Sequence, residues 1–111
     1  MMMPIKNLEQ DSLTRLLKNS NKVRPSVILA LPAWNAYDPQ VILLLEKLDT
    51  YFKSKASFYT LTTKLEDEFS IKYGLRNVPT LFIFDSKNIL VAQTFGNYDF
   101  NYLVEIIQPC V

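Results

Sequence analysis

The sequence predicts an α/β fold whose elements follow the order β-α-β-α-β-α-β-β-α. Short, continuous apolar runs, of which Val27–Leu31 is the clearest, are typical of strands that are buried on both faces of a sheet. The segments between these runs carry apolar residues at helical spacing. Late in the chain, the apolar runs Leu81–Phe84 and Ile89–Phe95 enclose a polar turn at 85–88, which predicts an antiparallel hairpin.

Four elements are expected in the first half of the chain. They are a short edge strand at Ile5–Leu8, a helix at Asp11–Asn19, the central strand at Val27–Leu31 and a helix from Pro39 to about Lys53. In the first of these helices, Leu13, Leu16 and Leu17 share one face. The second helix is expected to begin after Asp38, because Asp is a preferred N-cap and proline is tolerated at the first helical position. Its inward residues are Val41, Leu44, Leu45 and Leu48.

The second half of the chain predicts a strand, a helix, the hairpin and a last helix. The strand covers Ala56–Leu61, and the segment Thr63–Glu66 after it has the spacing of a capping box. The helix that this box would open ends at Gly74, a natural left-handed C-cap. The last helix is expected at Asp99–Gln108, with its apolar face formed by Leu103, Ile106 and Ile107.

Composition excludes several classes of function. The 111 residues predict one domain, 1–111, and the net charge of +1 without a basic stripe argues against nucleic-acid binding. Cys110 is the only cysteine and there is no histidine, so an intramolecular disulfide is impossible and zinc or haem has few ligands. No segment reads as a secretory signal or a membrane span. We therefore expect a reducing intracellular location, in the cytoplasm or an organelle matrix, with no cofactor, metal or membrane partner.

Two motifs make the chain resemble the thioredoxin family. Where the family has a Trp-Cys-Gly-Pro-Cys loop between a buried strand and a helix, this chain has Trp34-Asn35-Ala36-Tyr37-Asp38. The later segment Tyr73–Thr80 is similar to the family's Tyr-Gly-Ile-x-x-Ile-Pro-Thr, whose proline is cis. The resemblance extends from about Ile5 to Ile107. It implies a three-layer α/β/α sandwich around a mixed central sheet.

The sequence differs from the thioredoxin family at the residues that the family uses for thiol–disulfide exchange. The two cysteine positions hold Asn35 and Asp38, and neither side chain can exchange thiols with a disulfide. The resemblance places the family's buried acid at Leu29 and its lysine neighbour at Thr60. It places the proline that kinks the family's second helix at Leu43. These differences predict a redox-inactive member that is no thiol–disulfide oxidoreductase and has no catalytic residue.

The resemblance also implies a groove for a peptide or protein partner. In the family, the backbone of the residue before the cis proline pairs with an extended peptide, and Val78 before Pro79 takes that place here. The groove would be formed by Trp34, Asn35, Ala36, Tyr37, Val78, Pro79, Phe95, Gly96 and Asn97. Trp34 can equally be a binding platform or a cover for the end of the sheet. Asp38 is interpreted as a helix cap rather than a general base.

Two hypotheses about function follow. The favoured one is a protein-interaction module, acting as an adaptor, a chaperone-like factor or a small subunit of a larger assembly. The alternative is a glutathione-dependent or other non-thiol enzyme on the same scaffold, in which Asn35 or Tyr37 would activate the cofactor thiol. Such enzymes normally carry a second helical domain, for which this chain has no room. Cys110, near the end of the chain, is interpreted as a frayed terminal cysteine rather than a reactive thiol.

Overall fold

The computed structural model describes residues 5–19, 21, 23–32, 39–64, 66–75, 79–95 and 99–111. The strands are β1 (Lys6–Leu8), β2 (Ser26–Pro32), β3 (Ser57–Thr63), β4 (Thr80–Phe84) and β5 (Leu90–Phe95). The helices are α1 (Gln10–Lys18), α2 (Pro39–Phe52), α3 (Glu68–Tyr73) and α4 (Phe100–Ile107), followed by a 3-10 turn at Gln108–Cys110. The predicted order of elements is confirmed.

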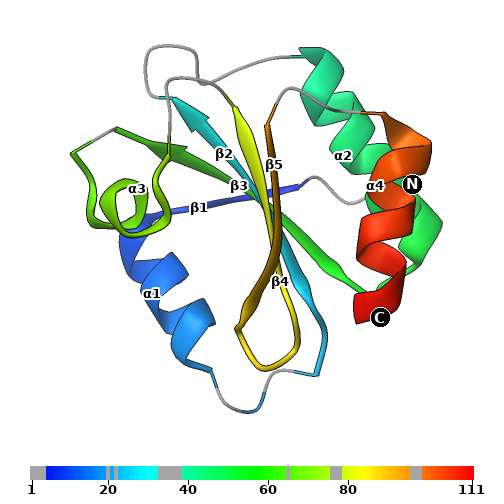
Figure 1. Ribbon diagram of the computed structural model, residues 1–111, viewed down its shortest axis with the longest axis horizontal. Helices are drawn as coiled ribbons and strands as arrows, with labels where there is room; N and C mark the ends of the chain where they lie inside the picture. The colour runs from blue at the N-terminus through cyan, green and yellow to red at the C-terminus, as the bar shows by residue number, and fades with distance from the viewer. Residues whose placement is uncertain are drawn as a thin grey trace.

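The five strands form one mixed sheet in the order β1-β3-β2-β4-β5. Strands β1, β3 and β2 are parallel, whereas β4 runs antiparallel to both β2 and β5. Helices α1 and α3 cover one face of this sheet, and α2 and α4 cover the other (Figure 1). The predicted α/β/α sandwich is therefore observed, with β2 at its centre and β1 at an edge.

The layer beneath α2 and α4 is mostly aliphatic, with the stacked rings of Phe52 and Phe58 among its buried side chains. Its buried side chains include Val27, Leu29, Leu31, Val41, Leu45, Leu48, Leu81, Ile83, Leu103 and Ile107. The predicted inward face of α2 is confirmed at Val41, Leu45 and Leu48, which are buried, while Leu44 is half-buried. Alternate residues of β2 point to opposite faces, so the continuous apolar run of this strand supplies both layers.

Aromatic side chains fill the layer beneath α1 and α3. Phe69 of α3 packs edge-on against Phe82 of β4, with 5.0 Å between the ring centroids. Tyr73 packs in the same way on Phe84 at 5.6 Å. Aromatic pairs in this geometry contribute about 0.5–1.5 kcal/mol beyond the burial of their area. The rings therefore fix the short helix α3 on the sheet.

The start of α3 corrects the sequence prediction. The capping box at Thr63–Glu66 is wrong, because Thr63 is the last residue of β3 and the helix begins at Glu68. Instead, the Lys64 N–H donates to Asp67 Oδ2 at 2.8 Å, and the Asp67 N–H donates to the Lys64 carbonyl at 3.1 Å. These two bonds close a turn between Lys64 and Asp67, and Asp67 is the residue directly before the helix.

The predicted end of α3 at Gly74 and the predicted start of the last helix near Asp99 are confirmed. Gly74 has a φ of 66°, in the left-handed region, and its N–H and that of Leu75 both donate to the Ser70 carbonyl. Such a left-handed residue is the usual C-cap of a helix. Asp99 caps α4, since its Oδ2 accepts from the Tyr102 N–H at 3.0 Å.

Candidate functional site

Strand register brings the anchors of the predicted groove to one end of the sheet. Thr80, at the start of β4, is opposite Ala30 of β2 on one side and Phe95 of β5 on the other. Pro32, where β2 ends, is opposite Thr63, where β3 ends. The carboxyl ends of β2, β3 and β5 and the amino end of β4 therefore meet at this end of the sheet, where α/β proteins commonly bind their ligands.

Two of the predicted groove residues lie within the described part of the chain. Phe95 is the last residue of β5 and its side chain is 48% exposed. Pro79 is half-buried and directly precedes β4. Since Phe95 is paired with Thr80, the next residue after Pro79, the register brings these two predicted site residues close together.

The other predicted groove residues lie outside the described residues. They are Trp34, Asn35, Ala36, Tyr37, Val78, Gly96 and Asn97, together with the expected helix cap Asp38. The Val78–Pro79 peptide bond is outside them as well, so its cis form stays a prediction. The structure does describe the elements next to these segments. β2 ends at Pro32, α2 begins at Pro39 and β4 begins at Thr80.

The positions corresponding to the family's buried acid and lysine are neighbours in the sheet. Leu29 of β2 is opposite Thr60 of β3, and Leu29 is fully buried. The Thr60 hydroxyl donates to Asn7 Oδ1 at 3.0 Å, so this group stabilises the contact between β3 and the edge strand β1. Neither side chain is ionisable near neutral pH. The pair therefore cannot move a proton in the way that thiol–disulfide exchange requires.

Cys110 lies in a different part of the molecule. Figure 1 shows the C-terminus well away from the end of the sheet at which β2 ends. The interpretation of Cys110 as frayed is corrected, because it belongs to the 3-10 turn and its half-buried side chain packs against the aliphatic core. Burial raises the pKa of the Cys110 thiol, and the nearby Asp85 carboxylate raises it further. A thiol with a raised pKa is a weak nucleophile.

A polar cluster missed by the sequence analysis connects β3 to α3. The Thr63 hydroxyl donates to Asp67 Oδ2 at 2.9 Å and lies 3.0 Å from the Ser70 hydroxyl. Ser70 donates to the Lys64 carbonyl at 2.6 Å. The hydrogen bonds from the Lys64 N–H and then from Thr63 lower the pKa of Asp67. Every hydroxyl in this cluster is bonded within it, so we interpret the cluster as a structural turn.

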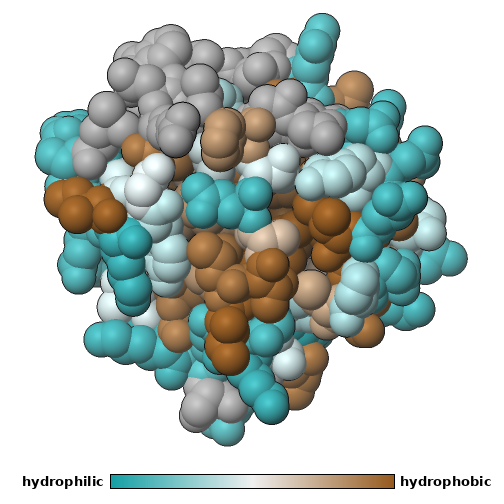
Figure 2. Space-filling view, viewed as in Figure 1, coloured by the Kyte–Doolittle hydropathy of each residue, from teal (hydrophilic) through white to brown (hydrophobic). Residues whose placement is uncertain are grey.

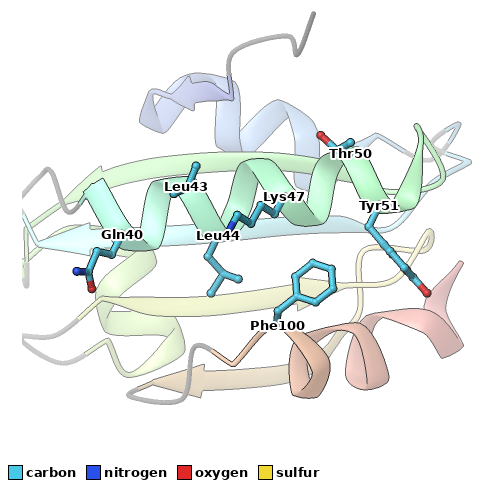
Figure 3. A pocket seen from close by; sticks show the side chains of 7 residues that line it. All are labelled: Gln40, Leu43, Leu44, Lys47, Thr50, Tyr51 and Phe100. Atoms are coloured by element: carbon cyan, nitrogen blue, oxygen red, sulfur yellow. The ribbon is translucent and has the colours of Figure 1, made fainter.

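The sequence analysis also missed a groove between α2 and the start of α4. The groove has a volume of about 770 Å³ and is lined by Gln40, Leu43, Leu44, Lys47, Thr50, Tyr51 and Phe100. Figure 3 shows that Leu44 and Tyr51 extend from α2 toward Phe100 of α4. The rings of Tyr51 and Phe100 are 5.7 Å apart and nearly perpendicular. Because its residues come from helices far apart in the sequence, local spacing gave no signal of this groove.

The described residues offer neither a metal site nor a helix that could span a membrane. Within them, no three side chains of His, Cys, Asp or Glu are grouped so as to hold a metal ion. In the same part of the chain, no helix combines the length and the apolar character needed to span a bilayer.

Comparison with known proteins agrees with the fold. No family model matches the sequence, and no curated protein matches it. Among solved structures, a mutant form of a thioredoxin from Entamoeba histolytica superposes with a TM-score of 0.68. The chain has a thioredoxin-like fold. The two sequences are 19% identical over 95% of this chain and 98% of the other, so the likeness to this thioredoxin concerns the fold alone.

The thioredoxin-like scaffold here lacks the pair of cysteines on which thioredoxin chemistry depends. Cys110 is the only cysteine, so no Cys-x-x-Cys pair exists anywhere in the sequence. Thiol–disulfide exchange within one protein requires an attacking thiolate and a second thiol that resolves the mixed disulfide. The sequence and the fold together therefore argue against thiol–disulfide oxidoreductase activity.

Proposed function

We propose that this protein is a redox-inactive, thioredoxin-like interaction module that binds a protein or an extended peptide. The observation that carries the proposal is the contrast between an intact scaffold and the missing chemistry. The described residues form five strands and four helices, whereas the cysteine pair is absent from the sequence and Leu29 and Thr60 stand where the resemblance places the buried acid and lysine. A scaffold that lacks the reactive groups still has a surface to which a protein or peptide can bind.

The surface proposed to bind is the sheet end that contains Pro79 and Phe95. An aromatic ring that is 48% exposed at the end of a strand offers a partner a large apolar contact area. The backbone of Phe95 is held by its pairing with β4, so no ordering of the main chain at this position is needed when a partner binds. Rigid, partly exposed aromatic side chains of this kind are enriched among the residues that dominate binding energy.

The first test is the native size of the protein in a lysate of its own cells, with mass spectrometry of the sedimentation fractions. We expect the protein to sediment with a second protein, at a mass well above the 12.9 kDa of the chain. Replacing Phe95 by alanine should release a large share of the protein from that complex. Ile71→Ala is the matched control, because Ile71 is 71% exposed but lies on α3.

Two results would contradict the proposal. One is wild-type protein that sediments without any other protein in every fraction. The other is a complex that loses as much of the Ile71→Ala variant as of the Phe95→Ala variant, because the contact would then lie elsewhere.

A further inference from the structure

The two edges of the sheet differ in how they resist pairing with another strand. β1 has only three residues and begins with Lys6, and short charged strands of this kind are how proteins usually protect a sheet edge. β5 has six residues, Leu90–Phe95, and contains neither a charged residue nor a proline. The edge formed by β5 therefore lacks two common protections.

Apolar side chains are exposed along this second edge. Figure 2 shows apolar atoms gathered at the centre of the face on which β5 lies in front. Val91 of β5 is 47% exposed, and Ile89 just before the strand is 58% exposed. Exposed apolar side chains therefore lie at the start of this edge, beside the regular part of β5.

The backbone of β5 has capacity for a second partner. In the described part of the chain, β5 is hydrogen-bonded to one strand only, β4. In an antiparallel pair, every second residue directs its N–H and C=O away from its partner, so an edge strand presents a row of such groups. The register shift opposite Ile83 and Phe84 is confined to the start of β5, and Ala92–Phe95 continue in regular register. This part of the edge is geometrically suited to accept a strand.

We propose that β5 pairs antiparallel with β5 of a second copy of this chain, joining the two five-stranded sheets across a two-fold axis. A strand pairing with itself in this way is self-complementary, because the same residues contribute to both sides. No like-charge contact arises within the pair, since β5 carries no charge. The net charge of the chain is +1, so long-range repulsion between two copies is weak. The inference does not rest on the proposed function.

The test is the mass of the purified full chain, measured by sedimentation velocity from low to high micromolar concentration. We expect a concentration-dependent species of twice the 12.9 kDa chain mass. Val91→Lys should weaken this dimer roughly tenfold or more, because a charge is then placed at the shared edge. Leu43→Lys should leave it unchanged, since Leu43 is equally exposed, at 49%, but lies on α2.

Two further measurements keep the test decisive if Val91→Lys unfolds the protein. Gln93→Lys places a charge at an exposed polar position of the same strand and should weaken the dimer in the same way. Amide hydrogen exchange should show protection of β5 that rises with protein concentration. The proposal is overturned by a mass of one chain at every concentration, by equal weakening in Leu43→Lys, or by β5 exchange that is independent of concentration.

Discussion

Two threonines of β3 show how differently the two faces of the sheet treat polar groups. Thr60 is opposite Leu29 and borders the aliphatic layer under α2 and α4, where its single side-chain hydrogen bond goes sideways to Asn7. Thr63 belongs to the cluster on the side of α3, where its hydroxyl contacts Asp67 and Ser70. Apolar side chains therefore surround Leu29 in the first layer, whereas the turn after β3 donates hydrogen bonds to the half-exposed carboxylate of Asp67.

This difference is clearest at Leu29, where the resemblance to thioredoxin places a buried acid. Beside Leu29 is a gap of only about 10 Å³, lined by Val41, Leu44, Leu45, Leu48, Leu81 and Leu103. A gap of this size with apolar walls stays dry, because a water molecule needs polar partners. A carboxylate at this position would lack water, and the hydroxyl of Thr60 opposite it already donates to Asn7 Oδ1. Leu29 is therefore part of the packed core.

The substitution Leu29→Asp gives the largest expected effect. It removes a fully buried leucine and introduces a carboxylate among aliphatic side chains, which together should cost about 4 kcal/mol or more. Urea denaturation at neutral pH measures the loss. Leu29→Ala is the control for the lost volume and should cost less, about 2–4 kcal/mol.

The pH dependence of this variant separates charge from volume. Burial raises the pKa of a carboxyl group, so the cost of the charge grows as the pH rises above the pKa of the unfolded state and disappears at lower pH. The stability difference between the aspartate and alanine variants should therefore shrink as the pH is lowered. If the stability difference between the two variants stayed constant with pH, the layer beneath α2 and α4 would be able to hydrate a charge, and the contrast with the turn after β3 would be wrong.

Thr63→Ala tests the polar side of the comparison and has an intermediate expected effect. The substitution deprives Asp67 of one of its two donors and Ser70 of a hydroxyl neighbour at a site that is 2% exposed. We expect a loss of about 1–2 kcal/mol in the free energy of unfolding. Thr62→Ala, at the adjacent exposed position of the same strand, should be close to neutral. Equal losses in the two variants would mean that the cluster adds nothing to stability.

Much of the fold could be predicted from the sequence because its signals are local. Three structures were each predicted from only a few neighbouring residues: strand β2 from its apolar run, the hairpin from its polar turn, and the end of α3 from Gly74. All three are confirmed. At the hairpin, Asp85 Oδ1 accepts from the N–H of Lys87 and of Ile89, which explains the turn signal in physical terms. The capping box was wrong because Thr63 is the last residue of β3 and its hydroxyl donates to Asp67 instead of accepting from a helix N–H.

The candidate site was less accessible to sequence reasoning, because its parts meet only through the sheet. That Phe95 is opposite Thr80 follows from the register of β4 and β5, which no local motif encodes. The groove lined by Leu44 and Phe100 needs two helices that are distant in sequence to pack together. For the groove residues Trp34 to Tyr37, the resemblance to thioredoxin supplies a prediction that partner-binding experiments must test.

The smallest expected effect concerns the charge on Asp67. Its pKa is lowered, first by the Lys64 N–H and then by the Thr63 hydroxyl. A lowered pKa contributes stability that is present above the pKa of the unfolded state and is lost as the pH falls through the pKa of the folded state. Asp67→Asn keeps an acceptor oxygen but removes the charge, so we expect a loss of about 0.5 kcal/mol near neutral pH and a smaller change at acid pH.

The matched control is Glu66→Gln, which changes the exposed acid that the predicted capping box would have used. Urea denaturation of both variants and the wild type between neutral pH and about pH 3 compares the two carboxylates directly. If Asp67 is the acceptor, only its variant loses stability at neutral pH and converges on the wild type in acid. If the glutamine variant behaved in that way instead, the helix start would be the one that the sequence predicted. A charge can therefore be stabilised on the α3 side of β3, where the backbone and a hydroxyl donate to it, but not beneath α2.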